Sequence, residues 1–267
     1  MRRVPRILGA IALLLAVAAV AGGPGGTADA ARRPKPSPSP SPSPSPSPSP
    51  SGVTCATSAT TVSFAGRTWN VRRNPTAKQG PGPNYFSGAN VCVGSDGLHL
   101  RIAKDAQGRW QCAEVFLGSS LGYGTYEWTV SSRVDNLNPE AVLGLFTYES
   151  DTREIDVEFS RWGWAGDPTN GQFVVQPYSN AGNLQRFTQT AIVTSIQRFT
   201  WTAGSVTFTS RSPDNAWNYS WTRTTTDVPT PGAEKVHMNL WLNAGNALAN
   251  GAMSAEVVIS NFTFTPA

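Results

Sequence analysis

The most restrictive feature of this chain is a stretch in which acidic and apolar residues strictly alternate. Residues 154 to 159 read Glu-Ile-Asp-Val-Glu-Phe, and a period of two is that of a β-strand, whose successive side chains point to opposite faces. Glu154, Asp156 and Glu158 are therefore predicted on one face of a strand, with three apolar side chains on the other. Carboxylates placed in this way repel one another, so the arrangement indicates a functional site.

The rest of the C-terminal part also predicts β-structure. Short runs rich in β-branched and aromatic residues are separated by clusters of Gly, Pro, Asn and Asp, and no long segment has the 3.6-residue period of a helix. We therefore predict an all-β domain, a jelly-roll sandwich of two antiparallel sheets, one of them curved. The clearest predicted strands are residues 97–102, 125–130, 172–176, 206–209 and 256–264.

Three segments of different composition divide the chain. Residues 1–30 combine early arginines, an apolar run and a small-residue cleavage signal, which together predict a secretory signal peptide. Residues 31–52 consist largely of Ser-Pro repeats, which predict an extended spacer. Residues 53–267 are long enough for one catalytic domain. We expect a secreted, extracellular protein with no membrane span, because no later stretch has the ~20 apolar residues that a spanning helix needs.

The predicted domain is close to neutral, although the whole chain is basic. Residues 53–267 hold 15 Lys and Arg against 16 Asp and Glu, a net charge of −1, because the excess of positive charge lies in the first 52 residues. The domain sequence has no basic stripe that would bind a phosphate backbone. The sequence therefore argues against a nucleic-acid partner.

The chain has three cysteines, Cys55, Cys92 and Cys112, all in the segment that we expect to be exported. In an oxidising compartment, one disulfide and one free thiol is the natural arithmetic. The spacing of the cysteines does not fit a zinc site, and with two histidines in the whole chain we expect no His/Cys metal centre. The residues alone leave the pairing open.

The acidic face fits the chemistry of cutting a glycosidic bond. Hydrolysis with retention of stereochemistry needs two carboxyl groups about 5 to 5.5 Å apart, one ionised and one protonated. At about 3.4 Å per residue, the Cα atoms of Glu154 and Glu158 lie about 13 Å apart, and two inward-leaning side chains on a concave strand close most of that gap. Asp156 between them would spread the three titrations apart. A solvated strand face or a calcium site is the blander alternative.

Aromatic side chains offer flat faces on which sugar rings stack. All nine tryptophans lie in residues 53–267, and most of them are expected in the core. Alternation along residues 237–241 directs His237 to the same groove as Asn239 and Trp241, as a hydrogen-bonding group and not a catalytic one. Further candidates for a carbohydrate groove, each with core packing as the alternative, are Tyr148, Trp162, Trp164, Tyr178 and Trp241.

Over nearly all of residues 60–267 the chain resembles glycoside hydrolase family 16. Residues 154–158 match the Glu-x-Asp-x-Glu signature of that family. The uninterrupted motif is similar to the lichenase and xyloglucan transglycosylase branch. Supporting pieces stand in the family's order along the chain, namely Cys112-Ala-Glu114, Gly122-Tyr-Gly124, Phe146-Thr-Tyr148, Gln176-Pro-Tyr178 and Asn239-Leu-Trp241.

This resemblance implies a concanavalin-like β-jelly roll and retaining cleavage of β-glucans, with no cofactor. It implies Glu154 as the nucleophile, Asp156 as its assisting acid and Glu158 as the general acid/base. The branch favours a β-1,3-1,4-glucan or a glucan with a β-1,4 backbone as the substrate. The implied substrate contacts are Glu114, Phe146, Tyr148, Gln176, Tyr178, Asn239 and Trp241.

Three positions depart from the family's pattern near the motif. Gln176 stands where lichenases typically carry Asn, and Phe116 stands where they carry Arg. Thr152 replaces the Trp that usually precedes the acidic residues. Subsite preference is therefore open.

Two stabilising features of the family also differ. In lichenases the disulfide partner of the Cys112 position lies near Asn84, so we expect Cys112 to pair with Cys92, with Cys55 or a free thiol as the alternatives. The family's structural calcium position near the last strand carries Asn261 instead of Asp. A bound calcium ion would serve stability and take no part in the reaction.

Our leading hypothesis is an exported, monomeric endo-β-glucanase that hydrolyses its polysaccharide through a covalent glycosyl-enzyme intermediate. A transglycosylase of the same family would pass that intermediate to another sugar instead of to water. A jelly roll that binds β-glucan without cutting it is the alternative from another class of protein. The complete set of Glu154, Asp156 and Glu158 favours an enzyme.

Overall fold

The computed structural model describes residues 52–267. This part of the chain consists of β-strands joined by turns and by single turns of 3-10 helix, and it contains no α-helix, so the predicted all-β class is confirmed. The predicted signal peptide and all but the last residue of the predicted linker lie outside the described residues. Among the residues described, no helix is long and apolar enough to cross a bilayer.

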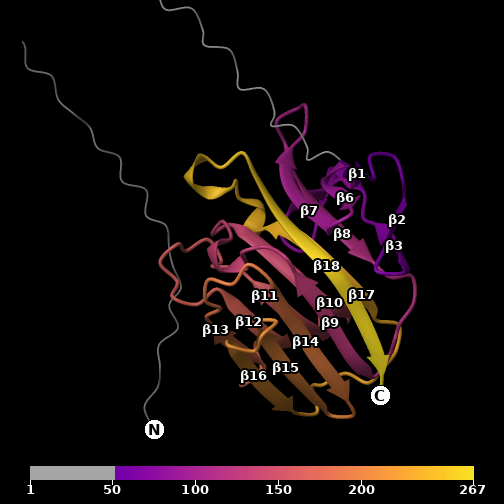
Figure 1. Ribbon diagram of the computed structural model, residues 1–267, viewed down its shortest axis with the longest axis vertical. Coiled ribbons are helices and arrows are strands. Elements are labelled where there is room, and N and C mark those ends of the chain that lie inside the picture. The colour runs from indigo at the N-terminus through magenta and orange to yellow at the C-terminus, as the bar shows by residue number, and fades with distance from the viewer. Residues whose placement is uncertain (1–51) are drawn as a thin grey trace, which may run out of the picture. The chain divides into compact units, whose positions relative to one another are not determined.

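One sheet, called here the cleft sheet, carries the acidic strand in its interior (Figure 1). Each strand of this sheet pairs with the next in antiparallel register. In order across the sheet they are β2 (Thr61–Phe64), β3 (Arg67–Val71), β8 (Trp110–Phe116), β17 (Lys235–Leu242), β10 (Ala141–Ser150), β11 (Arg153–Phe159), β12 (Gly171–Val175) and β13 (Leu184–Phe187).

The second sheet, called here the back sheet, is also antiparallel. Its order is β1 (Thr54–Cys55), β6 (Val91–Gly94), β7 (Gly97–Lys104), β18 (Ser254–Pro266), β9 (Gly124–Val130), β14 (Ser195–Thr202), β15 (Ser205–Arg211) and β16 (Asn218–Thr224). Strand β8 links the two sheets, since one part pairs with β17 and the other with β7.

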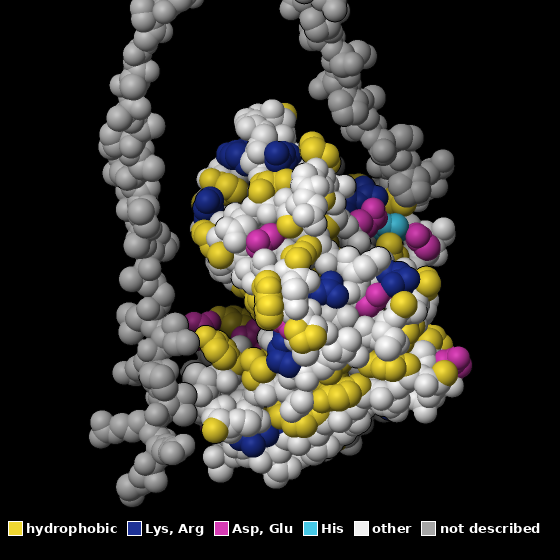
Figure 2. All heavy atoms as spheres, turned by 90° about the vertical axis from the view of Figure 1, so that its left-hand side faces the viewer, with side chains coloured by type: hydrophobic (Ala, Val, Ile, Leu, Met, Phe, Trp, Pro, Cys, Tyr) yellow, Lys and Arg dark blue, Asp and Glu magenta, His cyan; other side chains and the backbone are white. Residues whose placement is uncertain are grey.

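Short elements complete the described part of the chain. Strand β5 (Asn84–Phe86) pairs in parallel with β8 and antiparallel with β4 (Asn74–Gln79). The 3-10 turns are η1 (Gly88–Asn90), η2 (Val134–Asn136), η3 (Asn243–Gly245) and η4 (Ala249–Gly251). On the face seen in Figure 2, basic and acidic side chains are interspersed and do not gather into one patch of a single sign.

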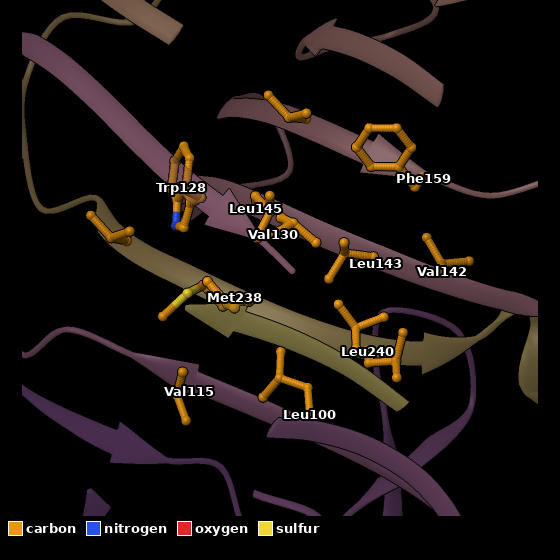
Figure 3. Close-up of a cluster of buried hydrophobic side chains, with 14 of the residues drawn as sticks. Leu100, Val115, Trp128, Val130, Val142, Leu143, Leu145, Phe159, Met238 and Leu240 are labelled. Atoms are coloured by element: carbon orange, nitrogen blue, oxygen red, sulfur yellow. The ribbon is translucent and has the colours of Figure 1, made fainter. Parts of the chain in front are cut away.

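The hydrophobic core lies between the two sheets (Figure 3). Leu143 and Leu145 of β10 enter it from the cleft sheet, and Trp128 and Val130 of β9 enter it from the back sheet, all fully buried. The apolar half of the acidic motif, residues 155, 157 and 159, is fully buried as well, which confirms the predicted alternation. Each such side chain contributes roughly 1.5–3 kcal/mol of burial free energy. The core therefore fixes β11 with its acidic face outward.

The disulfide differs from the expectation. Cys55 is bonded to Cys92, and Cys112 is a buried free thiol. The reason is register, because β1 pairs with β6 so that Cys55 stands directly opposite Cys92. Cys112 instead donates a hydrogen bond to Asn84 Oδ1 at 3.4 Å, and burial raises the pKa of its thiol to about 12. The expected bond between Cys92 and Cys112 is therefore wrong.

Removing this disulfide should destabilise the domain measurably. The bond joins residues 37 positions apart, and closing a loop of that size reduces the entropy of the unfolded chain enough to stabilise the fold by about 2–4 kcal/mol. The double variant Cys55→Ser, Cys92→Ser should lose that amount in urea unfolding. Reduction of the unaltered protein should give the same loss, and equal unfolding midpoints with and without reductant would contradict the prediction.

Candidate active site

Strand pairing gathers the acidic motif and its neighbours on one outward face of the cleft sheet. Each acidic residue of β11 stands opposite one residue of β10, and the pairs are Glu154–Tyr148, Asp156–Phe146 and Glu158–Gly144. On the far side of β10, strand β17 extends all three rows with the pairs Gly144–Asn239, Phe146–His237 and Tyr148–Lys235. Strand β8 adds Glu114 opposite Asn239. Residues more than 100 positions apart in sequence thus form continuous rows across the sheet.

This face lines a cleft of about 580 Å³, a volume in the usual range for ligand sites. The cleft brings together all three predicted catalytic residues and most predicted substrate contacts. The predicted residues that line it are Glu114, Phe146, Tyr148, Glu154, Asp156, Glu158, Asn239 and Trp241. Lining residues that sequence reasoning did not single out as sugar contacts include Arg72, Asn74, Gln79, Phe116 and Asp151.

Two predicted substrate contacts lie outside the cleft lining. Gln176 follows the end of β12 and lowers the pKa of Asp156, while its Oε1 accepts a bond from the backbone N–H of Tyr178 at 2.8 Å. Tyr178 itself is 64% exposed in the turn after β12. Gln176 thus supports the acidic trio, and Tyr178 is displaced from it because the strand has already ended.

Burial raises the pKa of each carboxyl in the trio, and repulsion by neighbouring carboxylates raises it further at Glu154 and Asp156. Burial, together with the charges of Glu154 and Glu158, raises the pKa of Asp156 well above its usual value. Burial also raises the pKa of Glu154 to about 8, although its hydrogen bond with Asp156 acts in the opposite direction. That bond raises the pKa of Asp156 and lowers that of Glu154, so it favours the state in which Asp156 holds the proton and donates to Glu154.

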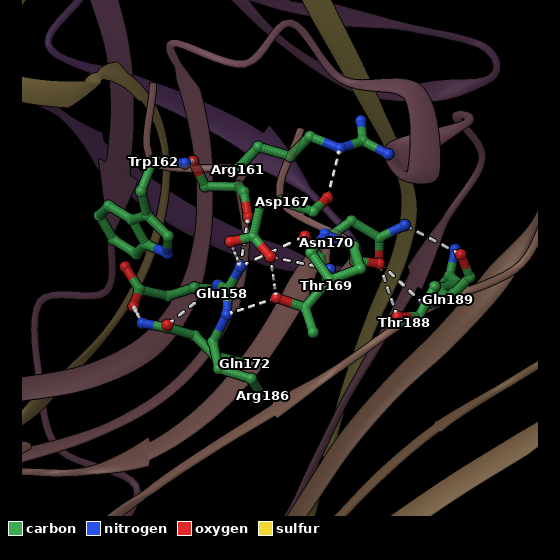
Figure 4. Close-up of polar contacts among 12 residues, drawn as sticks. Glu158, Arg161, Trp162, Asp167, Thr169, Asn170, Gln172, Arg186, Thr188 and Gln189 are labelled. Atoms are coloured by element: carbon green, nitrogen blue, oxygen red, sulfur yellow. Dashed lines mark hydrogen bonds and ion pairs between the residues drawn. The ribbon is translucent and has the colours of Figure 1, made fainter. Parts of the chain in front are cut away.

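Glu158 has a separate support on the neighbouring strands (Figure 4). Gln172 of β12 donates to its Oε2 at 2.6 Å, and Arg186 of β13 donates to Gln172 Oε1 at 3.1 Å. These groups favour the ionised form, but burial dominates and raises the pKa of Glu158 to about 7. The side chain can therefore hold or release a proton near neutral pH, as a general acid/base must.

Glu114 is held ionised at the opposite side of the cleft. Arg72 Nη1 donates to its Oε2 at 2.7 Å, and His237 Nδ1 lies 3.0 Å from its Oε1. Burial alone would raise the pKa of Glu114, but the hydrogen bond with His237 and the Arg72 charge outweigh it and lower that pKa. Unlike the carboxyls of the trio, Glu114 forms a direct ion pair, with Arg72, which suits binding and positioning more than proton transfer.

An aromatic stack crosses the floor beside this ion pair. The His237 ring stacks between Phe116 and Phe146, with centroid distances of 5.3 and 5.0 Å. The position at which lichenases typically carry Arg thus holds Phe116, whose ring is part of this stack. The cation next to Glu114 is Arg72, which directly follows β3, and no local signal in the sequence pointed to it.

Gly144 leaves room in the row that joins Asn239 to Glu158. A Cβ at this position would lie 2.5 Å from Asn239 Oδ1. Within the described residues, that buried oxygen has no hydrogen-bond partner, and neither has Asp156 Oδ2. Since unpartnered buried polar atoms are rare, these two atoms in an open cleft are candidates to bond sugar hydroxyls.

Gly144→Ala should therefore displace Asn239 and lower kcat/KM on a β-glucan by about tenfold or more, in line with the sensitivity of catalysis to ~1 Å misplacement. The urea midpoint should change little, because the added methyl group faces the cleft and not the core. Gly118→Ala is the matched control, since its Cβ would meet its nearest neighbour at an ordinary 3.6 Å. Equal activities of the two variants would contradict the role of the space above Gly144.

Asn261, at the family's calcium position, is exposed on β18. Within the described residues, no group of three or more His, Cys, Asp or Glu is arranged to hold a metal ion, and calcium also uses carbonyl oxygens. The prediction of no cofactor, with structural calcium as the alternative, stays a prediction, as does the monomeric state.

The chain was compared with known proteins. No family model and no curated protein matches it. Among solved structures, the β-glucanase of Bacillus licheniformis is 23% identical, with 74% of this chain and 92% of that chain covered and a TM-score of 0.59. A transglycosylase, Crh5, solved with NAG, is 17% identical, with coverages of 82% and 88% and a TM-score of 0.53.

A third similar structure is described as an immunostimulatory antigen and pseudo β-1,3-glucanase of Mycobacterium tuberculosis. It is 19% identical, with 72% of this chain and 88% of that chain covered and a TM-score of 0.52. These likenesses establish the fold: the chain is a β-jelly roll of the kind found in β-glucanases and in the Crh5 transglycosylase. The expected resemblance to glycoside hydrolase family 16 is thereby confirmed at the level of the fold.

Proposed function

We propose that the protein is a secreted, retaining endo-β-glucanase of glycoside hydrolase family 16 that acts on β-1,3-1,4-glucans or related β-glucans. The observation that carries the proposal is the trio of Glu154, Asp156 and Glu158, which lines one cleft with raised pKa values. Fold alone would not support an activity. The site supports one, because it combines the carboxyl groups of Glu154 and Glu158 with that of Asp156, which lies between them and can hold a proton.

In the proposed reaction, Glu154 attacks the anomeric carbon while Glu158 donates its proton to the departing glycosidic oxygen. The bond to that oxygen breaks, and a covalent ester to Glu154 forms. Glu158, now ionised, then takes a proton from water, whose oxygen displaces Glu154 from the sugar with net retention. The assignment of roles rests on the family resemblance and on the effect of Asp156 on Glu154, since burial raises the pKa of both glutamates.

The fixed partners of the trio support this division. Asp156, which keeps its proton, donates to Glu154 and stabilises it as the carboxylate. Gln172 orients Glu158 from the other side. Positioned donors and acceptors of this kind reduce the reorganisation that the transition state needs.

Transglycosylation is the alternative within the same chemistry, and it is supported by the presence of the Crh5 transglycosylase among the similar structures. The two differ in whether water or a sugar hydroxyl displaces Glu154. A non-catalytic jelly roll that binds β-glucan is the remaining alternative, and the pseudo β-1,3-glucanase among the similar structures supports it.

Product masses after incubation with lichenan, laminarin, xyloglucan and agarose would test the proposal. An endo-glucanase should release oligosaccharides of several lengths from at least one β-glucan, with reducing ends increasing in number. A transglycosylase should change the chain lengths with little increase in reducing ends. Binding without any change in product mass would leave only the lectin-like alternative.

A further inference from the structure

The loop between β11 and β12, residues 160–170, holds a bulky residue in a backbone conformation that favours glycine. Trp162 has a φ of +51°, and Gly163 after it has a φ of +81°. For a residue with a Cβ, the left-handed region costs roughly 1–2 kcal/mol. Such strain persists where the surrounding structure fixes it, and it concentrates at functional sites.

Backbone contacts on both sides hold Trp162 in this conformation. Its own N–H donates to Ser160 Oγ at 2.9 Å. The N–H of Gly163 donates to the carbonyl of Pro139 at 2.8 Å, and that of Trp164 donates to the carbonyl of Arg161 at 2.9 Å. A glycine at position 162 could make the same backbone bonds without the strain, so the backbone alone does not explain the indole ring.

The loop is also tied to the strand that supports Glu158 (Figure 4). Arg186 donates to Asp167 Oδ2 at 2.7 Å, to Thr169 Oγ1 at 2.8 Å and to the carbonyl of Ser160 at 3.3 Å. The same guanidinium bonds Gln172, which holds Glu158. The position of the loop is therefore fixed relative to the acidic trio.

The indole of Trp162 packs against a residue that lines the cleft. It packs edge-on against Trp241, with ring centroids 5.9 Å apart and an interplanar angle of 64°, and Trp241 lines the cleft. Trp162 is only partly buried, so part of its surface remains open. In Figure 4 the indole and the carboxyl of Glu158 point to the same side of the loop.

The position of Trp241 along β17 places its contact with Trp162 beyond the sugar ring that reacts. Trp241 stands two residues from Asn239 on β17, or about 7 Å along a strand, and Asn239 shares its row with Glu158 through Gly144. A residue that contacts Trp241 is placed to meet a neighbouring sugar ring rather than the ring at the scissile bond.

We propose that Trp162 is a sugar-stacking residue, which binds a ring of the β-glucan chain next to the reacting ring and so sets the length of chain that the cleft holds. This inference rests on the proposed function, because it takes the cleft to bind β-glucan. Stacking on the flat indole would use the part of Trp162 that the protein leaves uncovered. The alternative is that Trp162 serves only to pack against Trp241.

The test measures binding without catalysis. In a full chain that carries Glu154→Gln, the dissociation constant for the mixed-linkage hexasaccharide from lichenan is measured by calorimetry, with and without Trp162→Gly. Glycine removes the ring and relieves the backbone strain. We expect the dissociation constant to rise about tenfold, which corresponds to about 1.4 kcal/mol, while the disaccharide, too short to reach the loop, binds equally to both proteins.

Two further variants keep the result decisive. Val193→Ala changes an apolar residue that is 65% exposed and does not line the cleft, and it should leave the dissociation constant within twofold. Trp162→Leu keeps apolar contact with Trp241 without a flat ring, and it should show the tenfold rise even if the glycine variant does not fold. An unchanged dissociation constant in Trp162→Leu, or an equal loss in Val193→Ala, would overturn the proposal.

Failure of this inference and failure of the proposed function give different results. If the unaltered protein cleaves no β-glucan but the hexasaccharide still binds and Trp162→Leu weakens it, the enzyme proposal fails and the stacking role stands. If the protein cleaves lichenan and the Trp162 variants bind as tightly as their parent, the stacking role fails alone. Binding of neither saccharide by the Glu154→Gln protein would overturn both.

Discussion

Glu154→Gln is expected to reduce the release of reducing ends from β-glucan by at least about 10³-fold while leaving substrate binding nearly unchanged. The glutamine side chain has almost the same shape but cannot form the glycosyl ester, so the covalent route is lost. Because Asp156 donates to Glu154, an amide oxygen at the same position can still accept that bond. The loss should therefore appear in kcat and not in the dissociation constant.

The matched control for this variant lies on the opposite side of the domain. Glu127 of β9 belongs to the back sheet and pairs with Arg198 at 2.6 Å near the surface, so Glu127→Gln should keep activity within about twofold, as surface changes usually do. A loss of activity in both variants would show that the effect comes from the fold and not from the cleft.

Trapping of the intermediate would separate the two glutamates. A 2-deoxy-2-fluoro glycoside slows the second step, so the sugar should remain on a peptide that contains residues 153–161 and should be found on Glu154 by mass spectrometry. A label on Glu158 would reverse the proposed roles. An active enzyme that forms no ester with this reagent would contradict the retaining mechanism.

The catalytic strand could be predicted from the sequence because its signal is entirely local. Strict alternation in residues 154–159 fixes which side chains face the core, whatever strands lie beside them. The cleft around it depends on register between distant strands, which alternation does not specify. Asn239 and Trp241 were placed through the family resemblance, whereas Gln172 beneath Glu158 was missed because only the pairing of β11 with β12 brings it there.

The errors have the same physical origin. The pairing of Cys55 with Cys92 depends on β1 adding to the edge of β6, and strand β1 is only two residues long, too short to leave a pattern. Arg72 binds Glu114 from the connection between β3 and β4, and the sequence around it does not mark it as the partner of a residue 42 positions away.

Glu158→Gln should stabilise the fold at pH 8 and have almost no effect near pH 4. Burial raises the pKa of Glu158 from a usual value of 4.5 to about 7, so the folded state binds more protons than the unfolded state between these two values, and the free energy of unfolding falls as pH rises through that window. A shift of this size corresponds to at most about 3 kcal/mol. Glutamine stays neutral, so the variant avoids the loss.

Glu114→Gln provides the comparison with the opposite sign. Glu114 is buried in the same cleft, but His237 and Arg72 lower its pKa, so the stability that it contributes is present above the unfolded value and is lost as pH falls through the folded one. Its glutamine variant should therefore be less stable than the unaltered protein at pH 8, with the deficit shrinking toward acid. Urea unfolding of the three proteins at pH 4, 6 and 8 measures both trends.

A gain in Glu158→Gln that did not grow between pH 4 and pH 8 would contradict the raised pKa on which its role as a proton donor depends. The expected gain in stability also has a functional meaning. A residue whose removal stabilises the protein is retained for a reason other than stability. Glu158 would be such a residue, and the proposed reaction needs it as the proton donor. Opposite signs at Glu158 and Glu114 would thus separate the proton-transferring part of the cleft from the part that binds the sugar chain.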